Sequence, residues 1–215
     1  MSDHTPTLVP VDGDATRRYA GRMNLFGSEI VGVREQGERH VGRMPTDVLV
    51  ALWTRTSSGI VKRGFALEYR DLELPRTGTF DGLRIIIDPD VGFEMQCFIA
   101  LHLIGHSVQW VAPSLEHKLN ALQHTTDKEH FLQVLRDYEW EAAQFGLQLM
   151  HEVGIHDLDD WFSDFAATDW RYVERFYREE KIPPWEECIQ RNAAPVAPIP
   201  IPPLKHRQVA VRFAF

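Results

Sequence analysis

The feature that most constrains this chain is an apolar stretch from Phe98 to Trp110, FIALHLIGHSVQW, which carries two histidines. His102 and His106 are four positions apart. On a helix, residues with that spacing lie on one face, one turn from each other. Two imidazoles arranged in this way can bind a single zinc ion. The stretch therefore predicts a helix that offers two metal ligands on one side.

Composition narrows the class of protein. With 215 residues, the chain is long enough for one domain with a good core and a small appendage. The formal net charge of −8 argues against nucleic acid as a partner, because phosphate binding needs a basic surface. No apolar run approaches the roughly 20 residues that cross a bilayer, and the N-terminus does not resemble a signal peptide. Cys97 and Cys188 lie far apart and have no CxxC neighbour, so we expect reduced thiols in a cytoplasmic protein.

The first half of the chain is predicted to contain a helix followed by strands. The apolar residues between Val48 and Trp53 keep to one helical face, and Ser57-Ser58-Gly59 is expected to end that helix. Residues 59–90 contain alternating apolar stretches and turn residues, which indicate a small sheet. The consecutive isoleucines Ile85–Ile87 predict a strand that is buried on both faces or nearly so.

Three further helices are expected. The histidine helix should run from Gly92 to about Val111, because Pro113 disfavours helical backbone at the residue before it. Apolar residues recur at steps of three and four between residues 128 and 153, which predicts a long amphipathic helix. A third helical region is expected over residues 159–180.

The long amphipathic helix places two glutamates at the edges of its apolar face. Glu139 lies about 100° from Tyr138, and Glu141 lies about 100° from Ala142 on the other side. Periodicity alone therefore allows either glutamate to face the histidine helix. Two histidines with a carboxylate from a neighbouring helix would form a His₂Glu metal site with an open fourth position.

With these two helices, the chain resembles the core of the ImmA/IrrE family of zinc metallopeptidases. That family has a strand, then a helix similar to F-T-x-A-H-E-x-G-H, and later a helix similar to E-x-E-A-x-x-F-A. The resemblance covers roughly residues 45–153. The matching residues are Phe98, Ala100, His102, Gly105 and His106 in the first motif, and Glu139, Glu141, Ala142 and Phe145 in the second.

The resemblance implies a Zn²⁺ site with His102 and His106 as two ligands and Glu139 as the third, Glu141 being the alternative. This chain has Leu103 where the family has its catalytic glutamate. That glutamate polarises the zinc-bound water and carries its proton to the leaving amine, and leucine can do neither. We therefore expect a metallopeptidase-like protein with a binding or regulatory role, which holds a peptide or protein in the former substrate cleft.

Two other functions stay open. The first is an active zinc-dependent hydrolase with a substitute base, for which the candidates are Gln109 and Glu94. Gln109 lies one turn beyond His106 but is not basic, and Glu94 is two turns before His102. The second is a metal-free structural or interaction protein, in which the two histidines are simply buried and hydrogen-bonded.

The remaining histidines are weaker candidates for a metal site. His151 and His156 are five positions apart, which would place them about 140° apart on a helix and exclude a shared face. The other histidines, His117, His124 and His130, lie in a polar connection and are expected to face solvent. The alternative is that His124 or His130 acts as a substitute metal ligand.

Together these features predict an α+β fold, in which a small sheet packs on a helical core that the resemblance implies to be zincin-like. We divide the chain into an N-terminal segment of unassigned role (1–44), the metallopeptidase-like core (45–153), a helical extension (154–192) and a proline-rich arm (193–215). The arm's prolines favour an extended polyproline conformation, and its final VAVRFAF alternates like a strand. It is expected to pack on its own body or on a partner.

Overall fold

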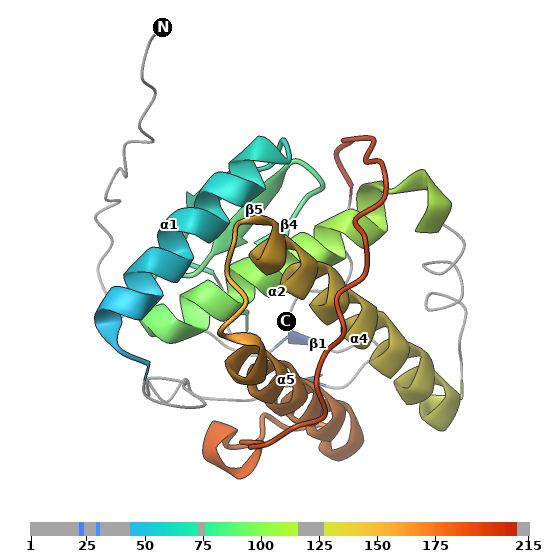
Figure 1. Ribbon diagram of the computed structural model, residues 1–215. Coiled ribbons are helices and arrows are strands. Elements are labelled where there is room, and N and C mark those ends of the chain that lie inside the picture. The colour runs from blue at the N-terminus through green and yellow to red at the C-terminus, as the bar shows by residue number, and fades with distance from the viewer. Residues whose placement is uncertain (1–21, 24–28, 31–43, 73–75, 116–126, 210–215) are drawn as a thin grey trace, which may run out of the picture.

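The computed structural model describes residues 22–23, 29–30, 44–72, 76–115 and 127–209 (Figure 1). The α-helices in these ranges are α1 (Thr46–Lys62), α2 (Phe93–Val111), α4 (Lys128–Glu152) and α5 (Asp159–Glu179), with 3₁₀ turns η1 (Pro113–Leu115) and η2 (Trp185–Glu187). The strands are β1 (Arg22–Met23), β2 (Glu29–Ile30), β3 (Ala66–Tyr69), β4 (Gly78–Phe80) and β5 (Arg84–Ile87).

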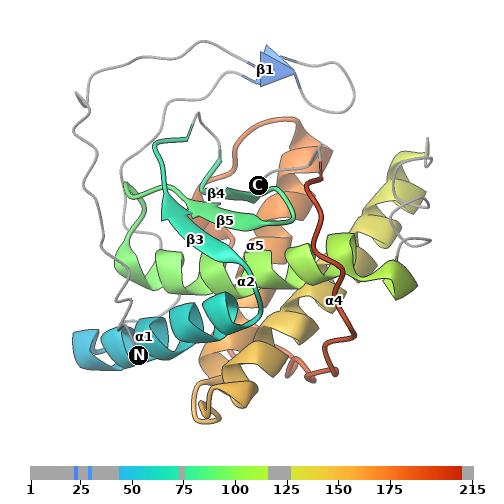
Figure 2. The same ribbon diagram turned by 90° about the horizontal axis from the view of Figure 1, so that it is seen from above.

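The histidine helix α2 is the central element of the fold. Every residue in it is buried except Phe93 and Gln96. The sheet strands β4 and β5 pack on it, as do α1 and α4, so that α2 runs between the sheet and the other helices (Figure 2). A helix that is apolar on nearly all sides has to be covered on nearly all sides. Its predicted extent, from about Gly92 to Val111, is confirmed.

The sheet beside α2 has three strands in the order β3-β5-β4, with β3 parallel and β4 antiparallel to β5. Its central strand contains Ile85, Ile86 and Ile87, all at most 4% exposed, as the run of isoleucines predicts. β4 approaches α2 closely at Gly78, where a Cβ atom would lie 2.7 Å from Leu103 Cδ1. The glycine therefore allows the strand to lie directly against the helix.

The predicted end of the first helix is wrong. α1 does not stop at Ser57-Ser58-Gly59 but continues to Lys62, so residues 60–62 are helical and not part of the sheet. Gly59 lies inside the helix at a close contact with α4, where a Cβ atom would be 2.7 Å from Val153 Cγ1. The chain turns instead at Gly64, whose φ of 89° is accessible to glycine at no steric cost.

The helices α2 and α4 cross with their backbones in contact. A Cβ atom at Gly105 would lie 2.0 Å from the Ala142 carbonyl oxygen, and one at Gly146 would lie 2.4 Å from the Leu101 carbonyl oxygen. These two glycines set the separation of the helices, because any larger residue would push them apart. α4 itself covers residues 128–152, close to its predicted extent, and Asp127 caps it by accepting a hydrogen bond from the His130 N–H.

The last part of the described chain returns along the body. α5 packs on α4 and closely matches the predicted third helix. Beyond η2 the chain is extended, and it is fixed to the body by hydrogen bonds from the Lys205 N–H to the Val111 carbonyl and from the Val209 N–H to the Asp81 carbonyl. Up to residue 209, the arm therefore packs on its own body. The predicted strand VAVRFAF lies outside the described residues, apart from Val209.

The fold is α+β, with helices and a small mixed sheet. The zincin-like character of the core and the division into four segments stay predictions. None of the helices in the described ranges has both the length and the hydropathy that a bilayer span requires. Cys97 and Cys188 are both buried, and both are free thiols.

Candidate metal centre

The two histidines of α2 point into one small buried site. His102 is 7% exposed and His106 is 1% exposed, and their Nε2 atoms lie 2.9 Å apart. Aromatic rings hold both imidazoles: Phe98 stacks on His102, and Tyr138 and Phe80 lie parallel to His106. The predicted face of α2 therefore exists, with the two ring nitrogens converging rather than merely lying side by side.

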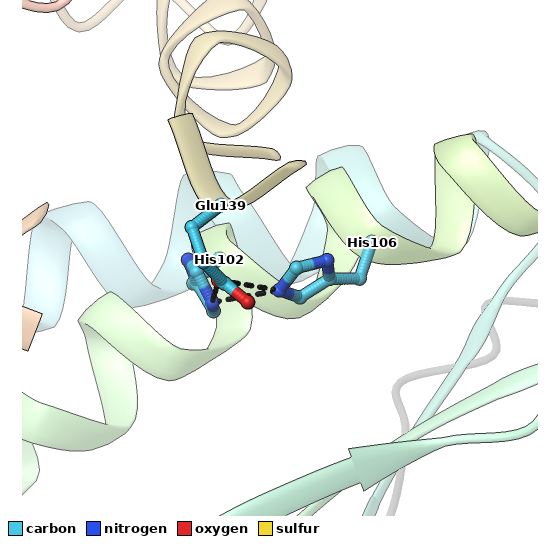
Figure 3. Close-up of side chains that lie close together, drawn as sticks. All are labelled: His102, His106 and Glu139. Carbon is cyan, nitrogen blue, oxygen red and sulfur yellow. Dashed lines mark hydrogen bonds and ion pairs between the residues drawn. The ribbon is translucent and has the colours of Figure 1, made fainter. Parts of the chain in front are cut away.

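Glu139 completes this group from the second helix. Its Oε2 lies 3.1 Å from His102 Nε2 and 3.0 Å from His106 Nε2, and its side chain is 5% exposed (Figure 3). This arrangement distinguishes the two glutamates between which the sequence leaves the choice open. Glu139 faces the histidines, whereas Glu141 lies next to Gln109 at the edge of the site. The close crossing of α2 and α4 brings Glu139 within reach.

Gln109 orients His106 through a chain of hydrogen bonds. Its side-chain NH₂ donates to the Tyr138 carbonyl at 2.8 Å and to Glu141 at 3.1 Å. The amide oxygen is therefore directed at His106 Nδ1, which lies 2.9 Å away. Because an amide oxygen can only accept, we assign a proton to His106 Nδ1, so that Nε2, which faces Glu139 and His102, is the nitrogen that could bind a metal.

The electrostatics of the metal-free site hold Glu139 ionised. Burial alone would raise the pKa of its carboxyl group, but the neighbouring charge of His106 and hydrogen bonds from both histidines lower it to about 2. Burial would likewise lower the pKa of His102, but its hydrogen bond to Glu139 and the charges of Glu139 and Asp169 raise it above the usual 6.5. The two shifts therefore favour the charged forms of both groups, an ionised Glu139 and a protonated His102.

The donor set fits a divalent metal ion. The ligand atoms of His102, His106 and Glu139 all lie within 4.8 Å of one another. Two donors about 2.1 Å from a tetrahedral ion would be about 3.4 Å apart, so the observed separations need to widen by only a few tenths of an ångström. Two nearby polar atoms, His102 Nδ1 and Glu139 Oε1, are buried without a hydrogen-bond partner among the described residues. Imidazole and carboxylate ligands are those that zinc commonly takes in proteins.

The residue directly after His102 is Leu103, not a glutamate. Leu103 is 6% exposed and packs against β4 at Gly78. Both predicted substitute bases have other hydrogen-bond partners. Gln109 is occupied with His106, and Glu94 accepts a hydrogen bond of 2.8 Å from the Trp161 indole. The structure thus gives no support to either of these residues as a general base.

One further carboxylate lies beside the site and was not predicted from the sequence. Asp169 on α5 has its Oδ2 3.8 Å from His102 Nε2. No motif marks it, because it comes from a third helix far along the chain and approaches only through the packing of α5 on α4. In the sequence, a carboxylate beside Trp170 in an amphipathic helix looks like an ordinary surface residue.

No other histidine in the described ranges joins the group. His130 is exposed, and His117 and His124 lie outside the described residues. His151 and His156 do have neighbouring rings, 4.5 Å apart, because α4 ends at Glu152 and the argument from helical angles does not apply beyond it. They nevertheless form no three-ligand group: within the described residues, the one found is His102, His106 and Glu139.

No family model, curated protein or solved structure matches this chain. The assignment of the site therefore depends on its own geometry. That geometry is a buried group of two histidines and one glutamate that can hold a metal ion.

Proposed function

We propose that this protein binds one zinc ion through His102, His106 and Glu139, and that it is a degenerate relative of the ImmA/IrrE metallopeptidases. The observation that carries the proposal is the convergence of three buried ligand atoms at 2.9–3.1 Å from one another. The family resemblance adds the choice of zinc. In this proposal the protein acts by binding or regulation, with a peptide or protein as its partner, rather than by cleaving peptides.

The chain's own residues support binding more strongly than catalysis. A bound zinc ion would supply a Lewis acid at the site. Peptide hydrolysis also needs a group that accepts and then returns a proton, and loss of such a base typically lowers the rate by about 10²–10⁴. Leu103 cannot do this, and its side chain packs on the sheet. The proposed partner is inferred from the resemblance alone.

The competing proposal is a metal-free structural role, and the geometry of Glu139 argues against it. Such a role would favour two histidines bonded to ordinary protein groups and a glutamate that faces solvent. Glu139 is instead buried and directed at both imidazoles, and its Oε1 has no hydrogen-bond partner within the described part of the chain. Burying a carboxylate destabilises the folded protein, and two helices can pack together without one.

Metal analysis of the purified protein tests the proposal directly. We expect about one equivalent of zinc in the wild type and none in His102→Ala. His130→Ala is the matched control, because His130 is exposed on α4 and should keep full metal content. Absence of stoichiometric zinc from the wild type, or equal zinc in His102→Ala, would show that this is not a metal site.

Assays of peptide cleavage separate the degenerate protein from an active hydrolase. Zinc-dependent cleavage that Glu139→Ala abolishes would establish an enzyme with a substitute base. If the wild type is inactive, we compare Leu103→Glu with Leu103→Gln, which has the same size but cannot accept a proton. Activity gained only by Leu103→Glu would show that the missing glutamate is what separates this site from a peptidase.

A further inference from the structure

A third helix contributes a carboxylate to the site. Asp169 lies on α5, and its Oδ2 is 3.8 Å from His102 Nε2. Its side chain is 14% exposed, so it is largely removed from solvent. The site therefore has polar groups from α2, α4 and α5, although the sequence motifs contain only the first two of these helices.

The nitrogen that Asp169 approaches indicates its role. A carboxylate that merely orients a metal-binding histidine normally accepts a hydrogen bond from the ring nitrogen that does not bind the metal. On His102 that nitrogen would be Nδ1, which has no hydrogen-bond partner among the described residues. Asp169 instead lies beside Nε2, the same atom that faces Glu139 and His106. Its position is therefore on the metal side of the imidazole.

We propose that Asp169 is the fourth protein ligand, so that the metal centre is a closed His₂GluAsp site. This inference rests on the proposed metal binding by His102, His106 and Glu139. A carboxylate oxygen bound to the same tetrahedral ion would lie about 3.4 Å from His102 Nε2. Asp169 Oδ2 is now 3.8 Å from that atom, so the side chain has to move toward the ion when the ion binds. Asp169 is not part of the group whose ligand atoms all lie within 4.8 Å of one another, which consists of His102, His106 and Glu139.

Charge balance favours the same arrangement. A divalent ion held by two neutral imidazoles and Glu139 alone would leave one net positive charge in a site whose ligands are at most 7% exposed. Uncompensated charge in such surroundings is costly. A second carboxylate, from Asp169, makes the centre neutral.

A fourth protein ligand has a functional consequence. Structural zinc sites have four protein ligands, whereas catalytic sites keep one position for water or substrate. A closed centre needs no proton-accepting glutamate, which accounts for the tolerance of Leu103 at that position. The ion would then tie α5 to the α2–α4 pair, so that the metal maintains the packing of three helices.

Cobalt substitution tests this inference with a readout other than activity. Co²⁺ is added to the metal-free wild type, Asp169→Ala, Asp169→Asn and the control Asp160→Ala, an exposed position on the same helix. We expect the intense visible absorption of tetrahedral Co²⁺ in the wild type and no change when acetohydroxamate is added. Asp169→Ala should bind Co²⁺ at least about 10–100-fold more weakly, the range known for loss of a supporting partner, and its spectrum should respond to acetohydroxamate.

The outcomes distinguish this inference from the proposed function. If the wild type binds no Co²⁺, or binds it equally well after His102→Ala, the metal site itself is refuted. If His102→Ala abolishes binding but the wild-type spectrum already responds to acetohydroxamate, the site is open and Asp169 is not a ligand. Unchanged affinity in Asp169→Ala would overturn the inference as well. Asp169→Asn keeps the shape of the side chain and removes its charge. It replaces Asp169→Ala in this comparison if Asp169→Ala does not fold.

Discussion

At the scale of single residues, the chemistry of the site depends on groups that do not belong to the ligand set. Gln109 is 2% exposed, and each end of its amide has a partner, so its orientation is fixed. It keeps the proton of His106 on Nδ1 and leaves Nε2 available. A ligand whose tautomer is fixed in advance does not have to be reorganised when the metal binds.

Gln109→Ala should therefore weaken zinc binding by about 10–100-fold without removing any ligand. The measurement is competition with a chromophoric chelator, and Gln133→Ala is the control, because Gln133 is exposed on α4 and bonds only to Asp137 among the contacts seen. An affinity for Gln109→Ala within twofold of the wild type would show that the amide does not orient His106.

The pair formed by Glu139 and His102 predicts how the stability of the metal-free protein depends on pH. The pKa of Glu139 is lowered from 4.5 to about 2, so its contribution is complete above pH 4.5 and is lost as the pH falls toward 2. The pKa of His102 is raised above 6.5, so its contribution is complete below pH 6.5 and is lost as the pH rises through the raised value. Stability from this pair should therefore be greatest between about pH 4.5 and 6.5.

Denaturant unfolding in the presence of a chelator, at several pH values, measures this dependence. Glu139→Gln is the informative comparison, because it removes the negative charge on which both shifts depend. The unfolding free energy of Glu139→Gln should vary less with pH than that of the wild type, both below pH 4.5 and above pH 6.5. Parallel profiles for the wild type and Glu139→Gln would contradict the predicted coupling.

At the scale of elements, glycines determine which helices can approach each other. Gly105 and Gly146 lie where the backbones of α2 and α4 touch, and Gly59 lies where α1 contacts α4. The obstacle differs between these contacts. At Gly105 it is the backbone of Ala142, which cannot move without moving the helix, whereas at Gly59 it is the end of the Val153 side chain.

Gly105→Ala should destabilise the protein by about 1–3 kcal/mol or more, the usual cost of overpacking. It should also weaken metal binding, because it pushes Glu139 away from the histidines. Gly59→Ala should cost much less, since a side chain can rotate and alanine favours the helix by up to about 1 kcal/mol. Thermal unfolding and zinc titration of both variants test the comparison. Equal effects on both properties would show that the α2–α4 contact does not set the site.

At the scale of the whole molecule, the chain after α5 packs against the body and contributes residues to the core. Val196 is 4% exposed, and its N–H donates to Ser163 Oγ at 3.0 Å. Further along, Ile199, Ile201 and Leu204 pack against Val108, Ala112 and Phe145, which lie on α2, just past its end and on α4. The proposed boundary at residue 193 thus separates a segment of different composition from a body on which that segment packs.

Val196→Ser should lower the free energy of unfolding by about 1–3 kcal/mol, because it removes buried apolar surface and buries a hydroxyl group. Ala197→Ser is the control at the next position, which is exposed, and should change it by less than about 0.5 kcal/mol. Chemical denaturation of both variants gives the comparison. If Val196→Ser is as stable as Ala197→Ser, the arm contributes nothing to folding.

The sequence by itself determined the elements whose burial leaves a recognisable local pattern. The continuous apolar run of α2, the three- and four-residue steps of α4 and the isoleucines of β5 each specify their own conformation, because burial imposes a local pattern. The same local rules placed His102 and His106 on one face. They also limited the third ligand to Glu139 or Glu141.

Only the tertiary structure decided the rest, because contacts between elements leave no local period. The choice of Glu139 over Glu141 depends on how α4 crosses α2, and that crossing depends on backbone contact at Gly105. The same reasoning explains why Gly59 is a packing residue and not a helix end. Asp169 approaches His102 from a helix that begins 20 residues after Glu139, since Asp159 opens α5, so no spacing rule connects the two. The sequence places both histidines on one helix, whereas bringing Glu139 and Asp169 beside them requires the packing of three helices.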